Sequence, residues 1–293
     1  MPHKPPQLKS NCRMLLYYIT DRRGFGGTEG EQQAAVLRRI GDAARAGVDY
    51  VQLREKDLSP RELERLAREA VRAVRDNSGT TKLLINRRSD VALACDADGV
   101  HLASGELSAI EIRPLWKKCS RREPVIGVSA HSIADVNRAA AEGADFAVLA
   151  PIFEKVQTEA KGIGLEALRE ASSTDGFPVL ALGGVGLDNA GACLWAGAAG
   201  VAGIRLFQIR DISETVRRYM RCRRRCCAAR LGILSQHDHG LTSAANTHAA
   251  AARLGEHSRS YPALTRRAKF LPPRCGWFVD SSHALFAATR KYH

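Results

Sequence analysis

Apolar runs and helical patterns alternate eight times between residue 14 and about residue 210. Most of the apolar runs are nearly continuous, which is typical of parallel strands that are covered on both faces. This pattern predicts strands over residues 14–20, 49–54, 81–86, 98–102, 124–129, 146–150, 178–183 and 200–204.

The segments between these runs are amphipathic. The clearest is residues 59–77, where apolar side chains recur every three or four residues. Ser59 and Glu62 have the spacing of a capping box, with Pro60 at the first helical position. Further helices are predicted over residues 31–46, ended by Gly47, from 132 to about 143, and from 187 to about 197.

Eight strand–helix units in about 210 residues match the size and repeat number of a TIM barrel. A doubly wound open sheet is the alternative, but no run has the character of an edge strand. We therefore expect an N-terminal extension over residues 1–13, a barrel domain over 14–220, and a disordered or weakly structured basic tail over 221–293.

Charge is divided unevenly along the chain. Residues 221–293 hold 13 Lys and Arg against 3 Asp and Glu, so the tail carries +10 of the net +13 and the first 220 residues carry +3. The barrel therefore has the charge of an ordinary small-molecule enzyme. There is neither a run of eighteen apolar residues nor an apolar segment like that of a secretory signal, so we expect a cytosolic protein without a membrane span.

Polar side chains gather where the second predicted strand ends. Gln52 and Arg54 share one face of that strand, and Lys56 follows in the loop. An amide, a guanidinium and an ammonium at one strand end suit an anionic, oxygen-rich ligand. A solvated charge cluster is the simpler interpretation of the same residues.

Five motifs in order resemble the thiamine phosphate synthase family, which includes the related thiazole tautomerases. The resemblance runs from about residue 14 to 207. Its motifs are Gln-Leu-Arg-Glu-Lys at 52–56, Ile-Asn at 85–86, Ala-Asp-Gly-Val-His-Leu at 97–102, Gly-Val-Ser-Ala-His-Ser at 127–132 and Gly-Gly-Val at 183–185.

The resemblance implies that a pyrimidinylmethyl diphosphate loses its diphosphate and that a thiazole phosphate captures the resulting cation, giving thiamine phosphate. Such a reaction needs stabilisation of the departing anion and the positioning of two reactants. By resemblance, Arg54, Lys56, Ser129 and Lys161 are the catalytic candidates. His101 is interpreted as a packed barrel histidine, because a histidine at such a position is more often packed than catalytic. The substrate-binding candidates are Gln52, Asn86, Arg87, Thr158, Glu159, Ala160, Gly184, Ile204 and Arg205.

The chain departs from the family where magnesium is expected. The family's synthases have an Asp after the third-strand Asn, and here that residue is Arg87. Glu106 is the second acidic candidate, so Mg²⁺ is expected to reach the site on the diphosphate, held by Glu106 and water. Either Arg87 supplies the missing positive charge, or the barrel is a tautomerase.

The basic tail suggests a further alternative from another functional class. Dense positive charge such as that from Arg221 to Arg225 is sufficient for phosphate contacts with nucleic acid. The tail has few aromatic residues between its charges and no nucleic-acid-binding motif, so we expect no specific nucleic-acid partner. Homo-oligomerisation is left open by the sequence.

Overall fold

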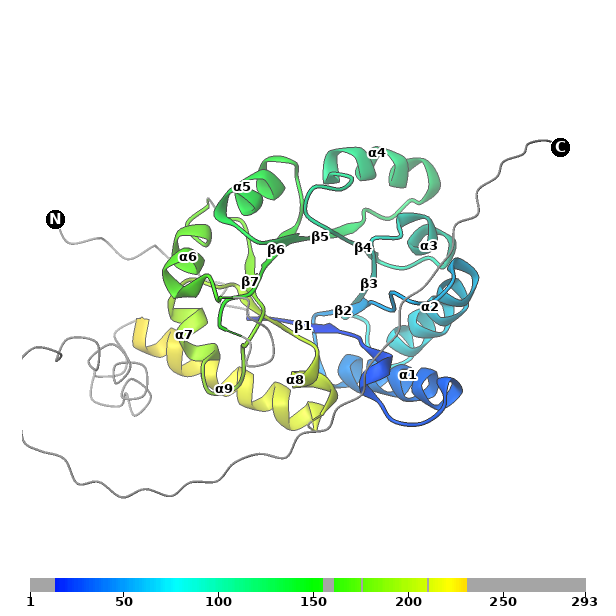
Figure 1. Cartoon of the computed structure of the whole chain (residues 1–293), viewed down its shortest axis with the longest axis horizontal. Coiled ribbons are helices and arrows are strands. Elements are labelled where there is room, and N and C mark those ends of the chain that lie inside the picture. Colours follow the sequence, from blue (N-terminus) through cyan, green and yellow to red (C-terminus); the bar gives the residue numbers. More distant parts are fainter. Residues whose placement is uncertain (1–13, 155–160, 175, 210, 231–293) are drawn as a thin grey trace, which may run out of the picture. The chain divides into compact units, whose positions relative to one another are not determined.

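The chain forms a closed barrel of eight parallel strands surrounded by helices (Figure 1). A computed structural model describes residues 14–154, 161–174, 176–209 and 211–230, with side chains described up to residue 222. Each strand pairs with the next, and β1 closes the ring on β8 with Leu15 opposite Gly200 and Tyr18 opposite Gly203. The predicted TIM barrel is confirmed, and the open-sheet alternative is wrong.

All eight predicted strands are present, most of them shorter than predicted by one or more residues. They are β1 Leu15–Ile19, β2 Tyr50–Leu53, β3 Lys82–Asn86, β4 Gly99–Leu102, β5 Val125–Ala130, β6 Phe146–Leu149, β7 Val179–Ala181 and β8 Gly200–Gly203. The described helices are α1 Glu29–Ala46, α2 Pro60–Arg75, α3 Ser89–Ala94, α4 Ala109–Cys119, α5 Ile133–Ala141, α6 Gly164–Ala171, α7 Ala190–Trp195, α8 Arg205–Gln208 and α9 Ile212–Arg230, with a short 3₁₀ turn, η1, at Arg22–Gly24.

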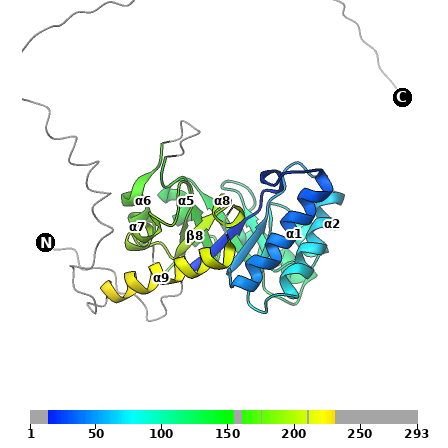
Figure 2. The same cartoon turned by 90° about the horizontal axis from the view of Figure 1, so that it is seen from below.

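Local signals place the long helices. The capping box of Ser59 and Glu62 is present at the start of α2, as predicted. A second one, made by Thr28 and Glu31, starts α1 two residues earlier than predicted. Gly47 ends α1 in the left-handed conformation, at φ 85°. The two capped helices pack side by side against the barrel (Figure 2).

Alternation along the strands separates two apolar layers. On β1, Tyr18 points outward into the layer between sheet and helices, where its ring lies 5.9 Å from that of Phe207. Tyr17 points inward and packs with Phe146 inside the barrel, at a ring-centroid distance of 5.4 Å. The interior is therefore filled by side chains, as in other barrels of this size.

The expected domain boundary at residue 220 falls inside α9, which continues to Arg230. Ile212, Val216 and Tyr219 are buried on one side of this helix, and α9 contacts α7 and α1. Residues 221–230 are thus helical, in contrast to the weakly structured tail expected from residue 221. The rest of that tail, residues 231–293, and the extension over 1–13 lie outside the described residues. Within the described chain, no helix combines the length and apolarity needed to span a membrane.

Candidate active site at the carboxyl end of the barrel

Nearly all the predicted site residues follow the carboxyl ends of barrel strands. Since all eight strands are parallel, these ends meet at one mouth of the barrel. The described candidates come from seven of the eight strand ends, namely Gln52 on β2 with Arg54 and Lys56 after it, Asn86 at the end of β3 with Arg87 after it, Glu106 after β4, Ser129 on β5, Lys161 after β6, Gly184 after β7, and Ile204 and Arg205 after β8. Thr158, Glu159 and Ala160 lie outside the described residues.

The end of β2 is held by a buried ionic cluster. The backbone N–H of Arg54 donates to Thr20 Oγ1 at 2.9 Å, and Thr20 Oγ1 donates to Glu55 Oε1 at 2.6 Å. Glu55 is only 5% exposed and also contacts the Arg22 guanidinium at 3.2 Å. Burial raises the pKa of Glu55, although its hydrogen bonds to Thr20 and Arg22 oppose that rise.

Arg22 is the centre of this cluster, and the sequence reasoning missed it. Its guanidinium binds Asp57 through two nitrogens at 2.6 Å each and Glu29 at 2.7 Å. The hydrogen bonds of Arg22 hold the pKa of Asp57 well below its ordinary value. The loop after β1 is thereby fastened to the loop that carries Arg54 and Lys56.

A second polar system crosses the barrel interior. Gln52 Nε2 donates to the Tyr17 hydroxyl at 3.1 Å, Tyr17 lies 3.1 Å from His101 Nδ1, and His101 Nε2 lies 2.9 Å from Ser129 Oγ. These side chains come from β2, β1, β4 and β5. Two predicted candidates, Gln52 and Ser129, are therefore connected through two residues to which the sequence assigned no role.

His101 is buried, as the packing interpretation expected, and it is also hydrogen-bonded through both ring nitrogens. Burial, together with the positive charge of Arg54, lowers the pKa of His101 to about 3. Its imidazole is therefore neutral near pH 7.

Arg87 and Glu106 bind each other. Arg87 Nε donates to Glu106 Oε2 at 2.9 Å, and the guanidinium also contacts the other carboxylate oxygen. Arg87 has a left-handed backbone, at φ 64°, and its N–H donates to the carbonyl oxygen of His101 at 2.8 Å. Glu106, the expected acidic ligand for Mg²⁺, is thus bound by Arg87, which stands where the family's synthases have the other acidic residue.

The loops after β6, β7 and β8 form the other side of the mouth. Gly184 has φ +67°, and a Cβ atom there would come within 2.7 Å of Phe153 Cβ. The peptide N–H of Phe153 donates to the Gly183 carbonyl at 3.0 Å, which joins the β6 and β7 loops. Ile204 and Arg205 follow β8, the strand that pairs with β7.

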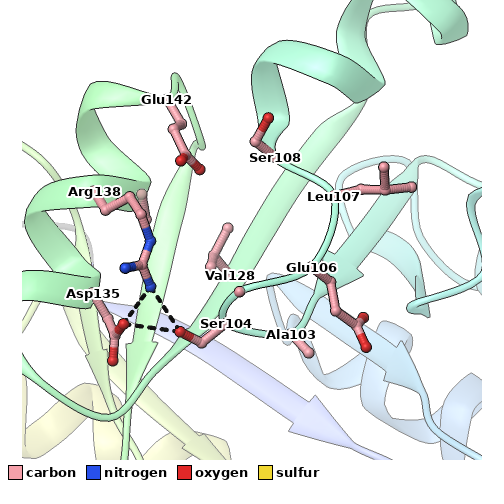
Figure 3. A pocket seen from close by; sticks show the side chains of 11 residues that line it. Ala103, Ser104, Glu106, Leu107, Ser108, Val128, Asp135, Arg138 and Glu142 are labelled. Carbon is pink, nitrogen blue, oxygen red and sulfur yellow. Dashed lines mark hydrogen bonds and ion pairs between the residues drawn. The ribbon is translucent and has the colours of Figure 1, made fainter.

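A separate cavity of ≈ 300 Å³ lies between the β4–α4 loop and α5. Ser104 and Asp135 hydrogen-bond at 2.9 Å, and Arg138 contacts both of them. Figure 3 shows Glu106 extending from its loop on the side away from Asp135 and Arg138. Glu106 also lines this cavity, so the cavity borders the loop after β4 at the barrel mouth.

Comparison with known proteins agrees with this geometry. The sequence model of the family described as thiamine monophosphate synthase matches residues 16–207, from β1 to α8. This chain belongs to that family. The resemblance predicted from the five motifs is thereby confirmed.

The match with this chain covers most of the length of each of these relatives. A protein of Aquifex aeolicus, provisionally named a thiamine-phosphate synthase, is 42% identical over 193 residues, which are 66% of this chain and 96% of the relative. The thiamine-phosphate synthase of Methanoregula boonei is 37% identical over 65% of this chain and 83% of its own. A thiamine phosphate pyrophosphorylase structure from Pyrococcus furiosus aligns with TM-score 0.60 and 27% identity, covering 73% of this chain and 96% of that one.

Proposed function

We propose that this protein is a thiamine-phosphate synthase, a transferase that couples 4-amino-2-methyl-5-pyrimidinylmethyl diphosphate with a thiazole phosphate. The bond between the methylene carbon and the diphosphate oxygen breaks, and its electron pair leaves with the diphosphate. The thiazole nitrogen then supplies the pair that forms the new C–N bond. The observation that supports this most is that Arg54 follows β2 and Ser129 lies on β5, at the carboxyl ends of a closed parallel barrel in a chain belonging to this family.

The residue types suit these steps. Arg54 lies at the mouth with its backbone fixed by Thr20, so its charge is held where an anion departs. Lys56 and Lys161 are exposed on the loops after β2 and β6, and they add positive charge on the solvent side. Ser129 and Asn86 supply neutral hydrogen bonds, and Gln52 orients the pyrimidine.

The second substrate would lie on the opposite side of the mouth. Backbone N–H groups approach an anion closely where no side chain intervenes, as at Gly184. Together with the N–H groups at Ile204 and Arg205, Gly184 would hold the thiazole phosphate. Holding both reactants at one mouth converts the coupling into an intramolecular step, which is a large part of such catalysis.

The residues present do not fit a magnesium site built from two carboxylates. Arg87 stands where one carboxylate is expected, and Glu106 gives both of its oxygens to Arg87. Within the described residues, His, Cys, Asp and Glu form no cluster of three or more that would hold a metal ion. No step of the proposed reaction is therefore assigned to Mg²⁺, and its use stays a prediction from the family resemblance.

Arg87 instead supplies positive charge at this position. Arg87→Asp tests this role, because Asp tolerates a left-handed backbone and keeps the loop intact. We expect coupling that depends more strongly on added Mg²⁺ than in the native protein. Arg88→Asp is the matched control, since it changes the same charge one residue away at the N-cap of α3, where Asp is favourable. An equal Mg²⁺ response in both variants would contradict a specific role for Arg87.

The proposed activity is tested with purified protein and both substrates, by following diphosphate release and thiamine phosphate. Arg54→Ala should remove most of the coupling. Arg45→Ala should not, because Arg45 lies in the last turn of α1, which leads into the opposite end of the barrel. Full turnover by Arg54→Ala would refute the assignment of the leaving group to Arg54.

The tautomerase alternative is decided by the same preparation. It is favoured by one observation, the replacement of the acidic pair by the Arg87–Glu106 ion pair. Conversion of a thiazole carboxylate phosphate without any coupling would establish it in place of the synthase. Cytosolic location and the absence of a specific nucleic-acid partner stay predictions from the sequence, which leaves homo-oligomerisation open.

A further inference from the structure

Gln52, Tyr17, His101 and Ser129 form a hydrogen-bonded row. Along this row each residue donates to the next, from Gln52 to Ser129, and this order is what we call its direction. Gln52 and Tyr17 are 1% and 0% exposed, and of the four residues only Ser129, on β5, is half-buried. Gly127 leaves room for this row, because a Cβ atom there would come within 2.9 Å of His101 Nδ1. The imidazole therefore lies in a closely packed space where its ring is held in place.

The direction begins at Gln52. Its Nε2 group can only donate, so the Tyr17 oxygen accepts that bond. Burial raises the pKa of Tyr17 well above its ordinary value, so the phenol keeps its proton. His101 Nδ1 is the acceptor that lies within reach at 3.1 Å, and the phenol proton is donated there.

The charge state of His101 then fixes the remaining bonds. A neutral imidazole has one N–H donor and one acceptor nitrogen. Since Nδ1 accepts from Tyr17, the proton is on Nε2 and is donated to Ser129 Oγ, 2.9 Å away. Ser129 thus accepts from inside the barrel, and its own hydroxyl proton is left for a partner at the mouth.

We propose that Tyr17 and His101 are positioning residues that hold Ser129 as a hydrogen-bond donor toward the departing diphosphate. The inference rests on the proposed function, since it deepens the role of Ser129 in that reaction. A hydroxyl whose oxygen already accepts a bond from within presents its proton outward without reorganising, which is the property that stabilises charge developing in a transition state. The same row links the pyrimidine side of the mouth, at Gln52, with the diphosphate side, at Ser129.

The reverse direction is a definite alternative. If the amide of Gln52 were turned over, Tyr17 would donate to it and accept from His101 Nδ1–H. His101 Nε2 would then accept the proton of Ser129, and no donor would remain for the diphosphate. The two directions differ in the tautomer of one histidine, which is measurable without any substrate.

Nitrogen-15 NMR of histidine-labelled full-length protein distinguishes the two directions. His101→Gln identifies the His101 signals among the nine histidines. We expect a neutral ring with the proton on Nε2, unchanged between about pH 6 and 8 because the pKa of His101 is about 3. A proton on Nδ1, or a charged ring, would overturn the proposal. Because this measurement needs no turnover, an enzyme inactive in the coupling assay would overturn the proposed function and leave this test valid.

Kinetics tests whether the row acts through Ser129. Tyr17→Phe keeps the ring and removes the donor to His101, and we expect it to lower kcat about ten- to a hundredfold without a comparable change in KM for the thiazole phosphate. Combined with Ser129→Ala, it should cause no further loss. Tyr18→Phe is the matched control, since it removes a hydroxyl from the next residue of β1 on the outward face.

Three kinetic results would each refute a positioning role. They are losses that add in the double variant, a Tyr17→Phe enzyme as active as the control, and a Ser129→Ala enzyme with full coupling. A merely structural role of Tyr17 predicts additive losses together with lower stability, so urea unfolding of each variant accompanies the assay.

Discussion

Replacing Arg22 with Met should destabilise the fold by about 3–5 kcal/mol, because it leaves a buried carboxylate without its partner. The Arg22 side chain is 3% exposed and binds three carboxylates. Of these, Glu55 has a side chain that is only 2% exposed, so water cannot replace the ion pair that its carboxylate makes with Arg22. Asp57 and Glu29 are 30% and 54% exposed and can be hydrated, so most of the loss arises at Glu55.

The adjacent residue provides the control. Arg23 is 70% exposed and contacts only one of the same carboxylates, Asp57 at 2.9 Å. Arg23→Met should therefore cost at most about 1 kcal/mol. Urea unfolding measures both variants, and in a domain of this size the expected difference corresponds to a fall in Tm of roughly 10 °C. Equal stability of the two variants would refute the view that burial makes Arg22 important.

Lowering the pH should reduce the difference in the free energy of unfolding between the native protein and the Arg22→Met variant. In the native protein Arg22 lowers the pKa of Asp57, and the stability from this pair is present above the ordinary pKa of 3.8 and lost as the pH falls below it. In the variant, Glu55 loses the guanidinium of Arg22 and keeps its hydrogen bond from Thr20, so the penalty of its charge grows as pH rises and disappears as it is protonated. Adding Glu55→Gln to Arg22→Met should restore part of the stability at pH 7, and a further loss would contradict this explanation.

Two other substitutions have definite expected outcomes. Gly184→Ala should raise KM for the thiazole phosphate and destabilise the fold by about 1–3 kcal/mol, because φ is +67° and the new Cβ would meet Phe153. Steady-state kinetics measures KM and urea unfolding measures stability, and no change in either would contradict this prediction. Tyr18→Phe should leave coupling unchanged and stabilise the protein by about 1 kcal/mol, because the buried Tyr18 hydroxyl has no hydrogen-bond partner among the described residues; a clear loss of stability would contradict that account.

The barrel and the location of its mouth were predictable because both depend on repeated local signals. Each strand has a near-continuous apolar run, and each strand end carries its own polar residues, so parallel topology was enough to bring Arg54, Ser129 and Gly184 to one end. The continuation of α9 had a signal as well. No Gly or Pro occurs from Ile212 to Arg230, whereas the tail's charge and its lack of a sustained apolar period suggested an earlier end.

The polar contacts within the site were not predictable from the sequence. Glu55 follows a strand in a charged segment, which reads as solvated, and its burial depends on Thr20 and Arg22 from a loop more than thirty residues away. The pairing of Arg87 with Glu106 likewise requires a left-handed backbone at Arg87, which its residue type does not indicate. Such contacts arise from tertiary packing, so local patterns carry no information about them.

The distribution of charge at the mouth follows from the cost of burying ions. A cation inside the barrel, below Arg54, would be expensive to desolvate, and His101 avoids that cost by staying neutral. One nitrogen of the neutral ring then accepts from Tyr17 and the other donates to Ser129, so the row from Gln52 to Ser129 stays connected without adding charge. Formal positive charge is concentrated on the rim, at Arg54, Lys56 and Lys161, where water can solvate it until a diphosphate arrives. The departing diphosphate thus meets cations on the rim and the neutral donor Ser129 below them. The interior needs no buried charge for this, because it depends only on the tautomer of His101.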